Sequence, residues 1–506
     1  MRTSRVKYII SRFKDEKGMA LPFVATMLVV LLGVAAFAVD LGWLYLNGTR
    51  LQRAADSSAL AGVVYLPGDT TGAADQAVNG ANANGWDIGT VNGNPVGGGG
   101  PDELTWQSLA DNKLEVTLQA SVPSFFVKVL GIDSFSLTRT ATAEYVKPVP
   151  LGSPANCFGI GGSVSSSGLS GGASTALSVC SGYTQNFWAG INGRRTAKEH
   201  GDPFGVACIT ASSSSCNGTN SDYRPNYFFG VEVPAGKTYL DVYIYDLGFY
   251  DRSGFAEAGD EQSLSNSASG GTHTTFSLFD PDQSPVIPSD NNDVSPCSVG
   301  GPNPHTVNSG SSSSTYKNRW LRICRVSNPE EGIYVLKIAN NGNIGGSNHY
   351  AILADTNNVA SNFPRVYGIN DMSIFTNAPS GSATIYLADV DPVHAGKTLE
   401  LEFFDPGEGA GNADMTVEPP PGVGPISCVW TATNGQSGNT CTLNTTISGT
   451  AQFNSEWITM QIDIPSDYTC STDCYWKMDA DLNVSHDRTT WTARVIGNPV
   501  RLVPNP

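Results

Sequence analysis

The stretch "GMALPFVATMLVVLLGVAAFAVDLGWLYLNGTRLQRAADSSALAG", residues 18–62, starts as an apolar run and ends as a pattern of small residues. Its residues 19–39 are 21 uncharged, mostly apolar residues, enough for a helix to cross a hydrocarbon core of roughly 30 Å. Past Asp40 the apolar and small side chains continue at helical spacing, at Leu44, Leu51, Ala55, Ala59 and Gly62. The stretch therefore predicts a transmembrane helix over 19–46 that continues, without a break, into a folded module over 47–147.

The residues before this run carry a concentrated positive charge. Residues 1–18 hold six basic and two acidic side chains, a net charge of +4. By the positive-inside rule, this short tail stays cytoplasmic and the bulk of the chain after Asp40 is extracytoplasmic. The alternative is a cleaved signal peptide, because Ala36-Phe37-Ala38 has the small-x-small pattern of a cleavage site. The length of the apolar run, and the helical pattern that continues past it, favour a retained single-pass anchor in the cell membrane.

The remainder of the chain is acidic and rich in glycine. The 506 residues have a formal net charge of −17, so the 488 residues after the tail carry −21. Such a surface repels phosphate backbones, which argues against nucleic acid as a partner. The length predicts two to four domains. Hydrophobic residues make up 40% of the chain and 55 residues are glycine, a composition typical of short strands joined by turns.

All ten cysteines lie beyond residue 156, after the apolar run. An even number confined to this part predicts disulfides in an oxidising compartment. Sequence alone leaves the connectivity open, and pairing of nearest neighbours would give five local loops. A zinc site at Cys470-x-x-x-Cys474 is the alternative, but no second close pair of cysteines or histidines accompanies it. The disulfide candidates are Cys157, Cys180, Cys208, Cys216, Cys297, Cys324, Cys428, Cys441, Cys470 and Cys474.

The segment "AVDLGWLYLNGTRLQRAADSSALAG", residues 38–62, resembles the signature of TadG-like proteins of Flp/Tad pilus-assembly systems. A second block, "LEVTLQASVPSFFVKVLGIDSFSLTRTATAEYV" at 114–146, also resembles the family, so that the resemblance covers residues 18–147. It implies a membrane-anchored accessory protein of pilus assembly. The motif residues are Val39, Asp40, Gly42, Leu51, Gln52, Ala54, Ala55, Asp56, Ala59, Leu60, Ala61 and Gly62.

The resemblance has two departures that bear on function. Related pseudopilins place Glu five residues after the processing glycine, whereas Phe23 stands five residues after Gly18 here. The TadG-like family lacks this acid too, which fits an accessory protein better than a main fibre subunit. Many TadG-like chains also carry a metal-dependent adhesion domain, but its Asp-x-Ser-x-Ser loop has no counterpart in this sequence.

Small residues at 54–62 have two explanations that can both hold. They would let another helix approach closely, or they would pack the helix on the strands predicted over 103–146 of the same chain. Packing within the chain is the simpler explanation. In a pilin-like arrangement, the first half of the helix lies in lipid and the second half covers a small sheet.

An internal duplication organises the chain from residue 226 onward. "VPAGKTYLDVYIYDLG" (233–248) parallels "VHAGKTLELEFFDPG" (393–407), and the segments that follow each of them also correspond. In this alignment Trp320 matches Trp457, Tyr334 matches Tyr475, and Tyr350 matches Trp491. Alternating apolar and polar residues bounded by Gly, Pro and Asn predict antiparallel strands, and each copy reads as a β-sandwich.

The expected fold is multidomain α+β/all-β, with a transmembrane pilin-like helix and a small sheet followed by two tandem antiparallel β-sandwiches. The predicted division is a basic tail (1–18), the transmembrane helix (19–46), a TadG-like α/β module (47–147), a Gly/Ser-rich linker and cysteine region (148–225), sandwich 1 (226–360) and sandwich 2 (361–506).

No catalytic set stands out, because the six histidines are scattered and neither His-Glu-x-x-His nor Gly-x-Ser-x-Gly occurs. We therefore expect no enzyme activity and no cofactor. Two acidic clusters are weak calcium candidates, since calcium takes six to eight oxygen ligands. They contain Asp280, Asp282, Asp290 and Asp293, and Asp479 and Asp481. Aromatic side chains such as Trp188, Trp430 and Tyr475 could stack on sugars, although core packing explains most aromatics in a sandwich.

The sequence thus predicts a cell-surface structural protein of the Tad (Flp) type that acts by protein–protein interaction. Its expected partners are the membrane, pilus or envelope proteins, and a cell-wall polysaccharide as a further candidate. The first alternative is a surface adhesin that binds glycan or calcium through its sandwiches, and the second is a secreted hydrolase.

Overall fold

The fold is described from a computed structural model of the chain. The described residues are 20–66, 70–96, 100–110, 112–145, 149–160, 164, 166–169, 173–182, 187–212, 215–245, 273–281, 297, 305–308, 318–340, 346–376, 382–407, 411–471, 473–481, 487–497 and 500–504. The chain divides into two compact units. Unit 1 comprises Met1–Val146 and Pro499–Pro506, and unit 2 comprises Lys147–Asn498.

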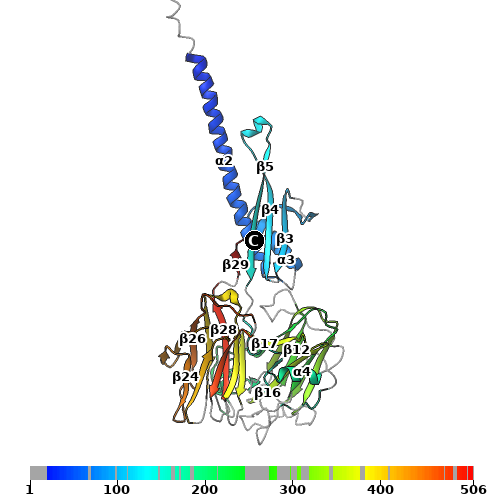
Figure 1. Ribbon diagram of the computed structural model, residues 1–506, viewed down its shortest axis with the longest axis vertical. Helices are drawn as coiled ribbons and strands as arrows, with labels where there is room; N and C mark the ends of the chain where they lie inside the picture. The colour runs from blue at the N-terminus through cyan, green and yellow to red at the C-terminus, as the bar shows by residue number, and fades with distance from the viewer. Residues whose placement is uncertain are drawn as a thin grey trace, which may run out of the picture. The chain divides into compact units, whose positions relative to one another are not determined.

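Unit 1 is built on one long helix, α2 (Ala20–Val63, 44 residues), and the unbroken helix expected from the opening stretch is confirmed. The first half of α2 projects beyond the sheet, while the second half lies along it (Figure 1). Among the described residues, α2 is the one helix long and apolar enough to cross a membrane. A second helix, α3 (Thr70–Ala83), packs against the C-terminal half of α2.

The sheet of unit 1 has six strands in the order β2-β1-β3-β4-β5-β29. Its strands are β1 (Ile88–Val91), β2 (Asn94–Pro95), β3 (Asp102–Ala110), β4 (Lys113–Pro123), β5 (Ser134–Tyr145) and β29 (Val500–Val503). In β4 every second side chain is buried, from Leu114 to Val122, and this apolar face packs against α2. Between β4 and β5 lies a short 3₁₀ helix, η2 (Val127–Leu130).

The edge strand β29 comes from the far end of the sequence. It pairs antiparallel with β5, with Val500 opposite Tyr145 and Arg501 opposite Glu144. Unit 2 is therefore inserted between two neighbouring strands of one sheet. The predicted six-part division of the chain stays a prediction, and the structure adds that the last described strand belongs with the anchor module.

Unit 2 shows the predicted duplication in its strand pairing. In one copy the orders are β13-β12-β15-β10 and β14-β11-β16, and in the other β24-β21-β27-β19 and β26-β20-β28. The first copy uses β10 (Asn226–Val233), β11 (Tyr239–Tyr245), β12 (His273–Phe279), β13 (His305–Asn308), β14 (Trp320–Ser327), β15 (Gly332–Asn340) and β16 (Ser347–Thr356). The second uses β19 (Ser382–Asp389), β20 (Thr398–Phe404), β21 (Ala413–Glu418), β24 (Thr442–Ile447), β26 (Trp457–Asp463), β27 (Tyr475–Asp481) and β28 (Asp487–Ile496).

The aligned aromatic residues occupy equivalent places in the two copies. Trp320 lies opposite Tyr245 across β14 and β11, and Trp457 lies opposite Phe404 across β26 and β20. The ring centroids are 5.2 Å apart in the first pair and 5.1 Å apart in the second. Two antiparallel β-sandwiches follow the helical module, which confirms the predicted fold class (Figure 1).

The two sandwiches share one continuous sheet. Strands β7 (Phe187–Asn192) and β18 (Asp371–Thr376) lie between β16 of the first copy and β28 of the second. This 11-stranded sheet also contains β6 (Cys157–Phe158), β22 (Cys428–Ala432) and β23 (Ser437–Gly438). One hydrophobic core runs through both copies, from Phe229 and Tyr350 to Leu399 and Trp491.

The remaining elements of unit 2 are short. They are α4 (Ala173–Cys180), η3 (Lys198–His200), β8 (Cys208–Ser212), β9 (Ser215–Thr219), β17 (Arg365–Ile369), η4 (Pro392–His394) and β25 (Thr450–Ala451).

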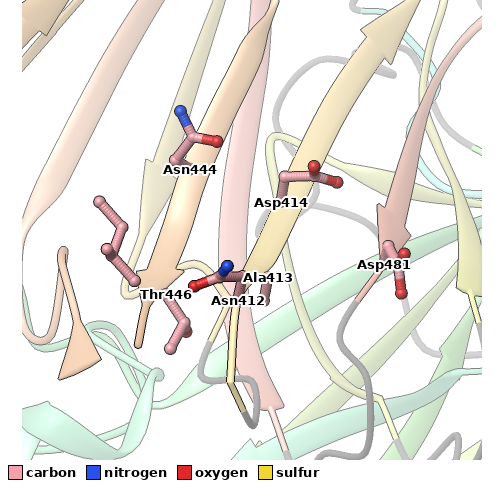
Figure 2. Close-up of a pocket in the computed structure, with 7 residues that line it drawn as sticks. Asn412, Ala413, Asp414, Asn444, Thr446 and Asp481 are labelled. Atoms are coloured by element: carbon pink, nitrogen blue, oxygen red, sulfur yellow. The ribbon is translucent and has the colours of Figure 1, made fainter. Parts of the chain in front are cut away.

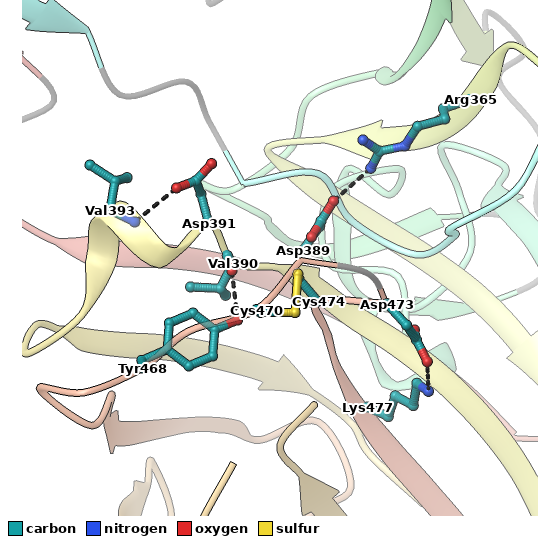
Figure 3. The surroundings of a disulfide bond; sticks show 10 residues. All are labelled: Arg365, Asp389, Val390, Asp391, Val393, Tyr468, Cys470, Asp473, Cys474 and Lys477. Atoms are coloured by element: carbon teal, nitrogen blue, oxygen red, sulfur yellow. Dashed lines mark hydrogen bonds and ion pairs between the residues drawn. A yellow bond between two sulfur atoms is a disulfide. The ribbon is translucent and has the colours of Figure 1, made fainter. Parts of the chain in front are cut away.

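The ten cysteines form five disulfides between nearest neighbours, which is the pairing expected from the sequence. The pairs are Cys157–Cys180, Cys208–Cys216, Cys297–Cys324, Cys428–Cys441 and Cys470–Cys474. Figure 3 shows the last of them. Tyr468 lies two residues before it and donates its hydroxyl to the carbonyl of Val390 over 2.7 Å. Since Cys470 and Cys474 bond to each other, the zinc alternative at this spacing is wrong.

The pairing of β29 with β5 generates a testable prediction. Glu144 is buried, and its carboxylate accepts hydrogen bonds from Arg501 Nε and Nη2 over 3.0 and 2.7 Å. Lys113 Nζ lies 3.4 Å from the other oxygen. Arg501→Met leaves a buried carboxylate with fewer partners, which costs about 1–3 kcal/mol. We expect hydrogen exchange at the β5 amides to accelerate about tenfold or more.

The control is Lys477→Met, which removes a more exposed ion pair with Asp473 and costs below about 1 kcal/mol. Equal exchange at β5 in Arg501→Met and wild type would show that β29 does not hold the sheet edge.

Candidate functional site: the anchor helix and its seat on the sheet

The family motif predicted from the sequence lies along α2 and divides into two sets of residues. One set is buried within the chain and comprises Asp40, Leu51, Ala54, Ala55, Ala59 and Gly62. The other set is fully or partly exposed and comprises Val39, Gly42, Gln52, Asp56, Leu60 and Ala61. The two sets have different physical roles.

Small side chains let the helix approach its neighbours closely. Ala54, Ala55 and Ala59 have no exposed surface. A Cβ atom at Gly62 would lie 2.6 Å from the carbonyl oxygen of Ala73 and 2.6 Å from Leu114 Cδ2. Contacts this short do not occur, so only glycine fits where α2 passes α3 and β4. The small residues therefore pack the helix within its own chain, as the simpler explanation expected.

Gly80 of α3 makes a matching close approach from the other side. A Cβ atom there would lie 2.9 Å from Ser58 Cα of α2. Gln52 adds a polar contact to the sheet, because its Nε2 donates to Asp56 Oδ1 over 2.9 Å and to the carbonyl of Thr140 in β5 over 3.1 Å. Gly80 was not among the residues predicted from the sequence, although the buried small residues of α3 recur at helical spacing, as they do in α2.

Asp40 holds the loop that follows β4. Its carboxylate accepts hydrogen bonds from three successive backbone N–H groups, those of Phe125 at 2.9 Å, Phe126 at 2.9 Å and Val127 at 2.7 Å. Trp43, one turn further along α2, packs edge-to-face on Phe125 with ring centroids 5.3 Å apart. These contacts fix the hairpin between β4 and β5 to the helix at the end of its apolar run.

Sequence reasoning found Asp40 as a motif residue but missed its partners. The partners are backbone N–H groups 85 to 87 residues away, and backbone groups carry no sequence signal. The available signal was indirect: the second family block contains Phe125 and Phe126, and a motif aspartate after an apolar run needs hydrogen-bond donors when it is buried.

Two residues of the exposed set, Val39 and Gly42, lie on a part of α2 that the described residues leave uncovered. A Cβ atom at Gly42 would meet no described atom within 4 Å, and Val39 is half exposed. Because they are three residues apart in a helix, Val39 and Gly42 lie on neighbouring positions of one face. We call this pair the open face of α2.

The calcium candidates are only partly described. Asp282, Asp290 and Asp293 lie outside the described residues. Asp280 is half-buried, and its burial, together with the nearby negative charge of Glu330, raises the pKa of its carboxyl. Asp479 accepts a hydrogen bond from Thr384 Oγ1 over 2.7 Å.

Asp481 lines a surface pocket of about 370 Å³ with residues of β21, β24 and the adjoining turn (Figure 2). It lies directly opposite Asp414 across β27 and β21, and Asn412 and Asn444 contribute side-chain amides. The described residues contain no group of three or more His, Cys, Asp or Glu side chains placed to hold a metal. Calcium at Asp479 or Asp481 stays a prediction.

The aromatic residues suggested for sugar stacking are mostly internal. Trp188 is buried in a hydrophobic cluster with Tyr245, Trp320 and Phe375. Tyr475 is buried on the face of β27 opposite that of Trp476, where its hydroxyl donates to the carbonyl of Ser153. Trp430 is partly exposed and packs edge-to-face on Phe453. The expectation of exposed aromatics is therefore wrong for Trp188 and Tyr475.

The glycine contacts generate a test that separates packing from helix propensity. Gly62→Ala should destabilise unit 1 by about 1–3 kcal/mol, because overpacking outweighs the roughly 1 kcal/mol by which alanine is the better helix former. Gly42→Ala, in open space on the same helix, is the matched control and should be neutral or stabilising. Thermal unfolding of the full-length protein in detergent measures both, and equal shifts would contradict the close packing at Gly62.

Asp40 generates a second test. Asp40→Asn removes the charge and one of the two acceptor oxygens, so that one or two of the three N–H groups of 125–127 lose their hydrogen bond, at a cost of about 1–3 kcal/mol. We expect faster hydrogen exchange at these amides, measured by mass spectrometry. Asp56→Asn, which keeps its acceptor oxygen for Gln52, is the control and should leave 125–127 protected.

Comparisons with known proteins bear on this anchor. A family described as putative Flp pilus-assembly TadE/G-like matches residues 18–76, while the second block at 114–146 lies outside the match. No curated protein matches the chain. A solved structure, the M60 catalytic domain with the CBM51-1 and CBM51-2 domains from Clostridium perfringens ZmpB, aligns over 77% of this chain and 43% of its own length. At 9% identity and a TM-score of 0.15, this alignment supports no argument.

The prediction of a TadG-like anchor is thus confirmed for residues 18–76, where the chain matches the TadE/G-like family of Flp pilus-assembly proteins.

Proposed function

We propose that this chain is a membrane-anchored protein of Flp-type pilus assembly that acts by binding other proteins. The pilus-assembly role is supported by the family match over 18–76. Single-pass anchoring is supported by α2, whose large apolar side chains from Leu21 to Leu46 are exposed in the folded chain. A surface of this kind is stable in lipid and costly in water.

The basic tail supports a cytoplasmic N-terminus, with the sandwiches outside the membrane. Five disulfides, all in unit 2, fit an extracytoplasmic location for that unit. Expected partners are pilus or other envelope proteins, and the cell-wall polysaccharide remains a further candidate.

The open face of α2 is the observation that favours binding of a neighbouring helix. Glycine inside a helix costs about 1 kcal/mol relative to alanine. Close packing within the chain explains why residue 62 is glycine. No such packing explains Gly42, where a Cβ atom would meet no described atom within 4 Å. Glycine on a membrane helix allows another helix to approach closely. The open face therefore supports contact with the helix of another protein, such as a pilus subunit.

Complementation of a deletion strain tests this proposal. Deleting the gene should abolish or strongly reduce surface pili, and the wild-type chain should restore them. Gly42→Leu fills the open face and should restore fewer than a tenth as many pili, with normal amounts of protein in the membrane. Electron microscopy of surface filaments measures the result.

The matched control is Gly33→Leu. Gly33 also meets no described atom, but unlike Gly42 it is not a residue of the family motif, and it lies nine residues earlier and hence on the opposite side of the helix. Unchanged piliation in the deletion strain would overturn the pilus role. Equal piliation with Gly42→Leu and Gly33→Leu would overturn binding through the open face alone.

A further inference from the structure

The hairpin between β4 and β5 ends in an apolar tip, residues 124–133. Five large apolar side chains there are exposed: Val129 (89%), Leu130 (81%), Phe125 (54%), Phe126 (50%) and Ile132 (43%). The tip is also an ordered structure. It contains η2, closed by Gly131 in the left-handed conformation, and Ser124 N–H donates to the carbonyl of Asp133 over 3.0 Å. An ordered loop that exposes this much apolar surface indicates a contact with something outside the chain.

The position of the tip along α2 identifies what it contacts. Asp40 binds the backbone of residues 125–127, so the tip is fixed beside the end of the apolar run (Figure 1). Asp40 is the one acidic or basic residue between Lys17 and Arg50. The 30 residues of α2 from 20 to 49 span about 45 Å, longer than the roughly 30 Å hydrocarbon core. The helix around residue 40 is therefore at membrane depth or in the adjoining interface.

The hairpin itself has the charge distribution of a membrane-facing element. Between Glu115 and Arg139 its acidic and basic residues are Lys128 and Asp133 alone. These two lie at the tip and face each other, with Lys128 Nζ 3.8 Å from Asp133 Oδ1. A lysine at this position can extend its amine to lipid phosphates while its methylene groups stay in the apolar layer.

Aromatic residues gather at the same level. Trp43 packs on Phe125. Tyr45, two residues further along α2, and Phe126, next to Phe125, are exposed. Tryptophan and tyrosine are enriched where a membrane meets water, because their rings are amphipathic. The side chain of Asp40 does not oppose this placement, since three N–H groups satisfy its carboxylate.

We propose that the tip of the β4–β5 hairpin inserts among the lipids of the membrane that α2 crosses, as a second anchoring element of unit 1. With two attachment points, helix and hairpin, the sheet has a fixed tilt and rotation against the bilayer. The occupant of the apolar tip is lipid, because the tip continues the exposed apolar surface of α2. This inference rests on α2 spanning the membrane, and it is independent of the pilus partner.

Site-directed spin labelling of the full-length chain in liposomes tests the proposal. The liposomes contain phosphatidylcholine and phosphatidylglycerol. Val129→Cys places the label on the most exposed tip residue, where no packing is lost. All ten native cysteines are paired, so the label reacts at the introduced thiol. The measurement compares relaxation by oxygen, which concentrates in lipid, with relaxation by a water-soluble nickel chelate.

We expect the ratio of oxygen to nickel accessibility at Val129→Cys to be at least fivefold higher than at Ile447→Cys, an exposed control in unit 2. Val30→Cys, on the exposed apolar run of α2, is the control for lipid contact. A ratio at Val129→Cys equal to that at Ile447→Cys would overturn insertion.

Two other outcomes also contradict the proposal. Low accessibility to both reagents at Val129→Cys would mean that protein covers the tip, either a second copy or a pilus subunit. A low oxygen ratio at Val30→Cys would remove the membrane span on which the inference depends. The accessibility of the spin labels does not depend on whether the chain takes part in pilus assembly. Failure of the proposed pilus role can therefore be distinguished from failure of hairpin insertion.

Discussion

Close contact between small residues of α2 and the sheet is the constraint on which unit 1 depends. The two halves of α2 have different surroundings. The first half exposes large apolar side chains, and the second half exposes almost none. In the second half, the small buried side chains of Ala54, Ala55 and Ala59 allow the helix backbone to lie close to its neighbours. Gly62 allows both α3 and β4 to contact the helix at the same point. Because α2 is unbroken from Ala20 to Val63, its exposed apolar half and the half packed on the sheet belong to one helix.

The parts of this structure that follow from local pattern could be predicted from sequence. The helix over 20–63, the alternation in β4 and the duplicated strands each repeat with the period of their secondary structure. Nearest-neighbour disulfides also follow from local loops. The partners of Asp40 could not be predicted in this way, because they are backbone groups brought together by the fold. The same holds for β29, which is four residues long and pairs with a strand more than 350 residues earlier.

The burial of Trp188 and Tyr475 depends on what covers each strand, which the duplicated sequence pattern does not specify. An aromatic residue in a Gly/Ser-rich stretch can lie on either face of a strand, and sequence alternation near Trp188 or Tyr475 does not say which face meets a second sheet. In the structure, the shared 11-stranded sheet covers positions that would be edges in two separate sandwiches. Trp188 lies on β7 of this sheet and is buried with Tyr245, Trp320 and Phe375, in a cluster that includes Ala173 and Ala176 of α4. Tyr475 lies on β27 of the five-stranded sheet, and its hydroxyl donates to the carbonyl of Ser153.

The insertion of unit 2 between β5 and β29 has a consequence for biosynthesis. The ribosome makes the chain from its N-terminus, so β5 lacks its neighbour β29 until all of Lys147–Asn498 has been synthesised. During that interval the sheet has an open edge, of the kind that pairs with other chains and aggregates. Until then the carboxylate of Glu144 also lacks its hydrogen bonds from Arg501. The sheet of unit 1 is thus completed only after the disulfide-containing unit 2 has been synthesised, which orders the two folding events in time.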